Sequence, residues 1–142
     1  MYNFLLQAHS GLRYLVLLAA VIVVLKSIIG LFGGLSYTKF DKILAPAYVG
    51  LMHLQLLIGL ILYFFFSPLV TYNMGDPVQR YWSVEHIALM IFAVAAAQIG
   101  RSISKKSNDA QVKFRFQSIF FGMSIVLVLI GLATMPGKGI LG

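Results

Sequence analysis

The sequence contains no cysteine among its 142 residues, and only 11% of its side chains are charged. Without cysteine the chain forms no disulfide, thiolate centre, iron–sulfur cluster or covalent c-type haem linkage. Soluble domains carry roughly 25% charged residues, so too few polar side chains are present here to cover a water-facing surface. Disorder is excluded as well, because disordered chains are poor in apolar residues and this one is 60% hydrophobic, with a mean hydropathy of +0.91. The composition predicts an integral membrane protein with one domain, residues 1–142.

Four apolar stretches follow one another, each close to the roughly 20 residues that a helix needs to cross the hydrocarbon layer. They cover residues 12–32, 45–66, 81–100 and 116–135. Backbone groups in lipid must be satisfied within their own segment, and no alternation with period two is present, so helices are predicted rather than barrel strands. The connections are short, so consecutive helices are expected to be antiparallel neighbours. The predicted fold is an all-α, up-down bundle of four membrane-spanning helices.

The excess of basic residues predicts the orientation of this bundle. The net charge is +7, which would favour nucleic-acid binding in a soluble protein. Basic residues of membrane proteins collect in the cytoplasmic loops, so we expect no nucleic-acid partner. Seven Lys and Arg fall in or beside the first and third connections, against three on the opposite side. Both termini are therefore predicted on the outer, periplasmic side of a bacterial inner (cytoplasmic) membrane.

Ionisable side chains within the spans are the first candidates for function, because placing them in a bilayer is costly. They are His9, Arg13, Lys26, His53, Glu85 and His86. From the helical rise, we expect His86 about 9 Å and His9 about 16 Å outward of the midplane. His53 is expected about 4 to 5 Å on the cytoplasmic side. Sequence motifs of zinc proteases, phosphate-binding loops and dinucleotide-binding folds are absent.

His9 and His86 share the outer half of the bundle on the first and third spans, which are diagonal in an up-down bundle. Two imidazoles at similar height across a central cavity suit the two axial positions of a haem iron, so both are predicted as metal ligands. Arg13 follows His9 by one turn and Arg80 lies just outside the third span, and both are predicted to bind haem propionates. A face of small residues below His86 leaves room for a flat ring, although such faces also serve close helix packing.

A second polar group is expected on the cytoplasmic half, around His53, Lys26 and Gln98. His53 is a candidate cofactor-binding residue, as the donor in a quinone or proton site. The alternative is that His53 only forms a hydrogen bond between helices. For Lys26 the simpler interpretation is that its long side chain extends to the inner membrane interface and has no further role. For Glu85 two interpretations stay open, an ion pair with a neighbouring arginine and a proton carrier at the outer mouth.

Three sequence islands, residues 9–14 (HSGLRY), 53–59 (HLQLLIG) and 80–86 (RYWSVEH), resemble a group of small four-helix membrane proteins described as cytochrome b-like. The resemblance covers nearly the whole chain and implies b-type haem in a respiratory or electron-transfer setting. It does not assign the ligands. Larger dihaem cytochromes b need four histidines and this chain has three, so at most one bis-histidine haem fits unless methionine or an oligomeric partner supplies a ligand.

The leading hypothesis is a membrane haem b protein that passes electrons between a quinol and a partner. One alternative is a non-catalytic accessory subunit of a larger, respiratory membrane complex, and another is a membrane enzyme acting on a porphyrin or a quinone. Haem b and a quinone are thus the expected cofactors. The lipid bilayer, a larger complex and a second copy of the chain are the expected partners.

Overall fold

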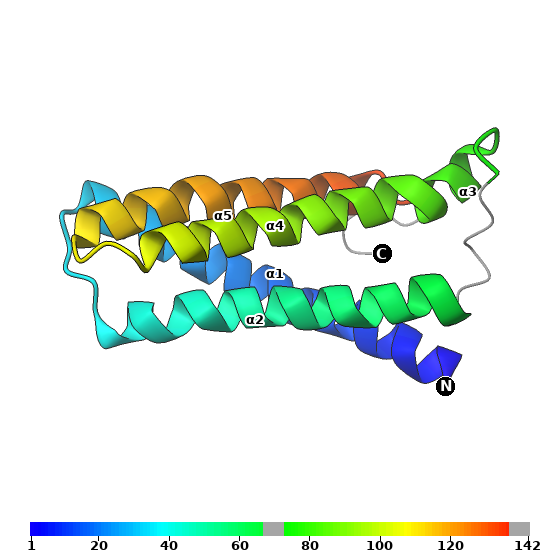
Figure 1. The fold of residues 1–142 in the computed structure, drawn as a ribbon, viewed down its shortest axis with the longest axis horizontal. Helices are drawn as coiled ribbons and strands as arrows, with labels where there is room; N and C mark the ends of the chain where they lie inside the picture. The colour runs from blue at the N-terminus through cyan, green and yellow to red at the C-terminus, as the bar shows by residue number, and fades with distance from the viewer. Residues whose placement is uncertain (67–72, 137–142) are drawn as a thin grey trace.

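The computed structural model of the chain describes residues 1–66 and 73–136, and these segments are helical without a strand (Figure 1). The long helices are α1 (Tyr2–Phe32), α2 (Lys39–Ile61), α4 (His86–Ser104) and α5 (Ala110–Ala133). A π-helical segment, η1 (Leu62–Phe66), prolongs α2, while the short α3 (Pro77–Arg80) and the π-helical η2 (Tyr81–Glu85) lead into α4. The all-α prediction is confirmed.

Four continuous helical segments are long and apolar enough to cross a membrane, which makes the chain a multi-pass membrane protein by helix length and composition. They run over Tyr2–Phe32, Lys39–Phe65, Pro77–Ser104 and Ala110–Ala133. The first begins at Tyr2 rather than at residue 12, because no proline interrupts these positions and the single Gly11 is tolerated inside a helix at a cost of about 1 kcal/mol. His9 and Arg13 consequently lie inside α1.

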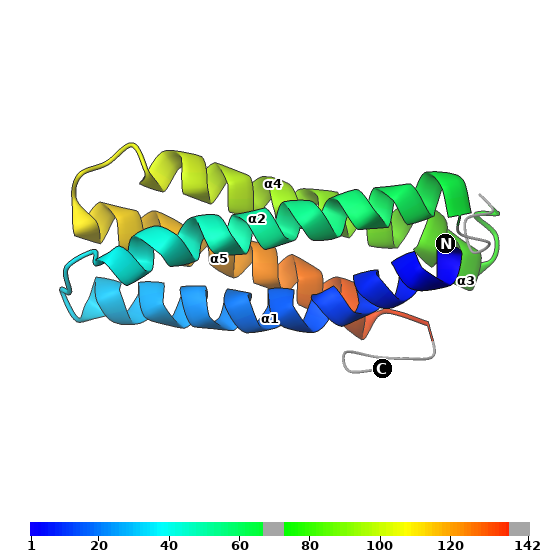
Figure 2. The ribbon, with the colours of Figure 1, turned by 90° about the horizontal axis from the view of Figure 1, so that it is seen from below.

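The long helices form a ring in which each packs against two neighbours. Helix α1 packs against α2 and α5, and α4 packs against the same two helices, so α1 and α4 occupy diagonal corners. The connections before α2 and before α5 lie at one end of the bundle, whereas α1 begins and α5 ends toward the other (Figures 1 and 2). The up-down order and the antiparallel neighbours are confirmed.

Small residues allow α4 and α5 to pack closely. Ala93, Ala97 and Gly100 of α4 are buried, and a Cβ on Gly100 would lie only 2.6 Å from Phe120 Cβ. Phe121 packs beside them in the buried core. Without a hydrophobic driving force between helices in lipid, such close backbone approach supplies much of the association. The small-residue face of the third span therefore serves helix packing.

The predicted second polar group separates into two parts, and Lys26 belongs to the part near the connection before α2. Lys26 Nζ pairs with Asp41 Oδ1 at 3.0 Å, and the Asp41 carboxylate also accepts from the Thr38 backbone N–H at 2.8 Å. Asp41 is only 3% exposed. The carboxylate thus caps the start of α2 and neutralises a cation on α1.

The same end carries a chain of hydrogen bonds that joins α1, α5 and the connection between α1 and α2. The Gln117 amide contacts Ser27 Oγ at 3.0 Å and donates to the Tyr37 hydroxyl at 2.6 Å. Tyr37 in turn donates to the Asp41 backbone carbonyl at 3.2 Å. Burial raises the pKa of the Tyr37 hydroxyl above its usual value. The bonds at this end of the bundle join the helices to one another and include Lys26, Ser27 and Gln117.

The packing of α4 on α5 is tested by Gly100→Ala with Gly122→Ala as its control. The added Cβ at position 100 meets Phe120 Cβ, which cannot move without its backbone, so a loss of about 1–3 kcal/mol in unfolding free energy is expected. At Gly122 of α5 no atom lies within 4 Å of an added Cβ, so Gly122→Ala is expected to be neutral or stabilising. Unfolding in one detergent measures both variants, and equal stabilities would contradict the packing described.

Candidate functional site

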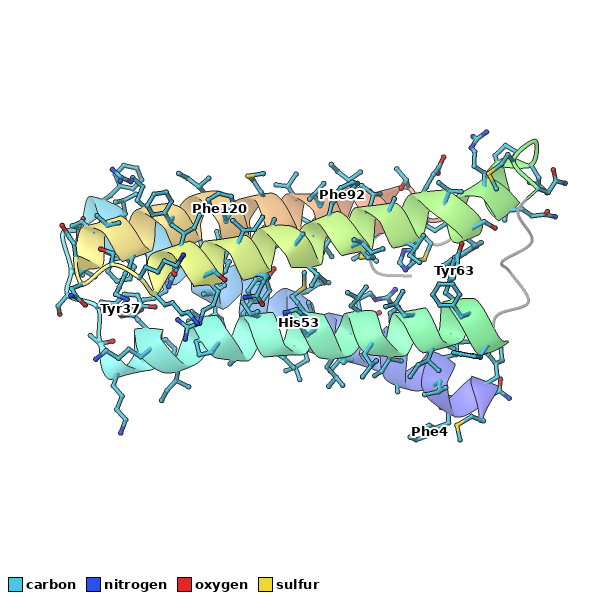
Figure 3. All side chains as sticks on the ribbon, viewed as in Figure 1. Phe4, Tyr37, His53, Tyr63, Phe92 and Phe120 are labelled. Atoms are coloured by element: carbon cyan, nitrogen blue, oxygen red, sulfur yellow. The ribbon has the colours of Figure 1, made fainter. Side chains whose placement is uncertain are left out.

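A cavity of about 360 Å³ lies between the four long helices, toward the end where α1 begins. Helix α1 crosses the bundle obliquely, so its first turns lie away from α5 (Figures 1 and 2). Figure 3 shows Tyr63 of η1 on the side of α2 that faces α4, at this end, and Tyr63 lines the cavity. Apolar side chains make up most of the wall, among them Leu6, Val16, Met52, Leu56, Leu60, Ile87, Met90, Val94, Val128 and Leu132. Small-molecule sites are cavities of this kind, roughly 300–1,000 Å³, with a few polar groups in an apolar wall.

His9 of α1 and His86 of α4 both line this cavity and face one another from diagonal helices. Their ring centres are 6.3 Å apart, and the ring planes are inclined by 85°. The structure therefore brings together the two histidines that the depth argument paired. They are held in different ways.

His86 is held by Tyr81, for which the sequence predicts no role in the site. Tyr81 Oη lies 3.3 Å from His86 Nδ1 and donates to the Gly131 carbonyl of α5 at 2.5 Å. Tyr81 is 1% exposed, and its ring centre is 5.7 Å from that of His86. Residues five apart are about 140° apart around a regular α-helix, so helical periodicity does not pair them. The π-helical η2 brings them together, because the His86 N–H bonds the Tyr81 carbonyl five residues earlier.

His9 is held by α2, which approaches it closely at a glycine. A Cβ on Gly59 would lie 3.1 Å from His9 Cε1, so the imidazole occupies the space that a larger residue needs. One turn before Gly59, Gln55 Nε2 donates to the His9 backbone carbonyl at 2.7 Å. The HLQLLIG island of the sequence thus contains the residues of α2 that support His9, although its own histidine does not lie here.

Three buried polar atoms on the cavity lining have no hydrogen-bond partner within the described segments. They are His9 Nδ1, Arg13 Nε and Gln55 Oε1. Arg13 Nη2 donates to the Tyr14 hydroxyl at 2.9 Å, and residues 1–66 and 73–136 place no carboxylate in ion-pair contact with this guanidinium. Buried polar atoms are nearly always paired in native proteins. Their concentration in one cavity makes this cavity the candidate binding site of the described residues.

Arg80 and Glu85 lie outside the cavity lining and pair with each other. Arg80 Nε lies 3.1 Å from Glu85 Oε1, and the two side chains are 45% and 44% exposed. Arg80 Nη1 also donates to the Met74 carbonyl at 3.4 Å. Of the two arginines predicted near His9 and His86, the structure places only Arg13 on the cavity wall.

His53 also lies away from the cavity, between α2 and α4 (Figure 3). Its Nε2 is 2.8 Å from Gln98 Oε1, and Gln98 Nε2 donates to Ser102 Oγ at 3.0 Å. This is the second part of the predicted polar group, a hydrogen-bonded bridge between neighbouring helices that does not include Lys26. Interhelical bonds of this type stabilise membrane bundles.

Comparisons with protein-family models, with curated proteins and with solved structures found no significant match for this chain. Within residues 1–66 and 73–136, no group of three His, Asp or Glu side chains is placed to hold one metal ion. A zinc centre needs three or four protein ligands.

The contact between α2 and His9 is tested by Gly59→Ala with Gly50→Ala as its control on the same helix. A Cβ at position 59 displaces the His9 ring by a few tenths of an ångström, whereas an added Cβ on Gly50 meets no atom within 4 Å. In spectra of ¹⁵N-histidine-labelled protein, the His9 ring signals are expected to shift in Gly59→Ala and to stay in place in Gly50→Ala. Unchanged His9 signals in Gly59→Ala would contradict the contact.

Proposed function

We propose that the cavity binds haem b with His9 and His86 as axial ligands, and that the chain is an electron-transfer protein of a bacterial inner membrane. One observation carries the proposal: two imidazoles face each other from diagonal helices across a cavity, with ring centres 6.3 Å apart. Haem b, when bound, supplies a one-electron acceptor and donor in the membrane. The resemblance of the HSGLRY and RYWSVEH islands to cytochrome b-like proteins supports the same cofactor.

The separation of the rings and the character of the wall fit this cofactor. Metal–imidazole bonds measure roughly 2.0–2.1 Å. Two such bonds, together with the distance from each bonded nitrogen to the centre of its ring, add up to about the separation of the two ring centres. The wall is largely apolar, as the face of a porphyrin requires, and no cysteine is present to form a thioether link. Met52, Met90 and Met135 also line the cavity and are the competing axial donors.

The unpaired Nε of Arg13 is a second observation that supports the proposal. Arg13 lines the largely apolar cavity without a carboxylate partner among the described residues, and its Nε is buried and unpaired. A propionate would accept from this group in a charge-assisted hydrogen bond. With the proposed orientation, Arg13 and the two histidines lie in the outer half of the membrane, and electrons pass between a quinol in the bilayer and a partner protein. The orientation rests on the basic residues of the first and third connections.

The ligands are tested by alanine variants of the three histidines in purified protein. His9→Ala and His86→Ala each remove one proposed iron ligand, so haem per chain is expected to fall by more than roughly tenfold, with loss of the low-spin spectrum in what remains. His53→Ala is the control, because His53 lies outside the cavity, and it is expected to retain full haem content. Reduced-minus-oxidised spectra and pyridine haemochromogen assays provide the measurement. Colourless wild-type protein, or a His86→Ala variant with the wild-type spectrum, would refute the proposal.

The role of Arg13 is tested by Arg13→Gln against Arg80→Gln. Hydrogen bonds to charged groups contribute about 1.5–3 kcal/mol, so Arg13→Gln is expected to speed haem loss roughly 10–100-fold. Arg80→Gln removes a guanidinium outside the cavity lining and is expected to leave that rate unchanged. Haem transfer to excess apomyoglobin, followed by absorbance, measures both rates. Equal rates in the two variants would argue against an anionic group at Arg13.

A further inference from the structure

The hydrogen bonds of Tyr81 determine which ring nitrogen of His86 carries the proton. Tyr81 Oη is 2.5 Å from the Gly131 carbonyl oxygen and 3.3 Å from His86 Nδ1. A carbonyl oxygen only accepts, so the single hydroxyl proton of Tyr81 is directed to Gly131. The contact with His86 then requires the imidazole to donate, which places its proton on Nδ1.

No other group competes for this nitrogen within the parts of the chain that the structure describes. Trp82 packs against the imidazole with ring centres 5.5 Å apart, and its indole nitrogen is a donor without acceptor capacity. The Glu85 carboxylate, next in the chain, is engaged by Arg80 at 3.1 Å. Tyr81 is therefore the acceptor that His86 uses, and its near-complete burial keeps water from replacing it.

We propose that Tyr81 is a positioning residue: it holds His86 in the Nδ1–H tautomer and so reserves the Nε2 lone pair for the ligand in the cavity. The consequence for a bound iron rests on the function proposed above. A histidine that donates its second N–H is a more basic ligand, and a hydroxyl that itself donates to a carbonyl is a better acceptor through cooperativity along the chain of bonds. Tyr81 would thus favour the oxidised state of an iron bound to His86 and lower its reduction potential.

The tautomer is measured directly by ¹⁵N NMR of histidine-labelled protein, reduced with dithionite so that any haem iron is low-spin and diamagnetic. The chain has three histidines, and the signals of His86 are those missing from His86→Ala. The expected result is a protonated Nδ1 and an unprotonated Nε2 in the wild-type protein, and the haem-free sample is decisive because iron bound at Nε2 would impose this tautomer without Tyr81. A proton on Nε2 overturns the proposal.

The effect on the cofactor is measured by redox titration of Tyr81→Phe, with Tyr48→Phe as its control. Tyr48 is equally buried, its hydroxyl contacts Ser124 Oγ at 2.5 Å, and it does not line the cavity. Ser124 keeps a second partner in the Phe121 carbonyl when that hydroxyl is removed. The midpoint potential is expected to rise in Tyr81→Phe and to stay at the wild-type value in Tyr48→Phe.

Equal potentials in the two variants would overturn the tuning role of Tyr81. The two measurements also separate this inference from the proposed function. Protein without haem contradicts the proposed function, and the tautomer of His86 then decides alone whether Tyr81 positions the ring. Haem-containing protein with equal midpoint potentials in Tyr81→Phe and Tyr48→Phe keeps the proposed function and removes the tuning role of Tyr81.

Discussion

Polar atoms inside an apolar bundle must find partners within the chain, and this requirement shapes the whole structure. In hydrocarbon no water is available, and an unpaired polar group costs several kcal/mol. The few polar side chains of the spans are accordingly bonded across helices: Lys26 to Asp41, Gln117 to Ser27 and Tyr37, and His53 to Gln98. These bonds lie in the middle of the bundle and at the end that carries the connections before α2 and before α5. In these parts the helices are joined by their own side chains.

At the opposite end of the bundle, where the cavity lies, some buried polar atoms have no partner among the described residues. Around His9 and Arg13 the described residues leave three buried polar atoms unpaired beside a largely apolar cavity. On the other wall Tyr81 donates to the Gly131 carbonyl and contacts His86 Nδ1. In the proposed function, Tyr81 orients His86 before the cofactor binds, and the cofactor would supply the bonds that the polar atoms near His9 lack. The apolar wall would receive the face of the proposed haem and Arg13 its acidic edge.

Much of the fold follows from the sequence, because runs of about 20 apolar residues separated by short connections permit few arrangements. The approach of His9 to His86 follows from their depths and from the diagonal placement of their helices. Contacts that depend on a departure from regular α-helix geometry cannot be predicted from the sequence in this way. The pairing of Tyr81 with His86 needs the π-helical η2, and the pairing of Lys26 with Asp41 needs the path of the connection before α2. The partners of Arg80 and His53 depend on side-chain directions that depth alone does not specify.

We propose that His9 and His86 together bind one haem iron. Near-infrared magnetic circular dichroism of the oxidised wild-type protein tests this ligation, because the position of the charge-transfer band identifies the two axial ligands. The expected band is that of bis-imidazole ligation, with one haem b per chain. A band typical of imidazole–thioether ligation would show that a cavity methionine takes the place of one histidine as ligand. Protein free of haem would contradict haem binding at this site altogether.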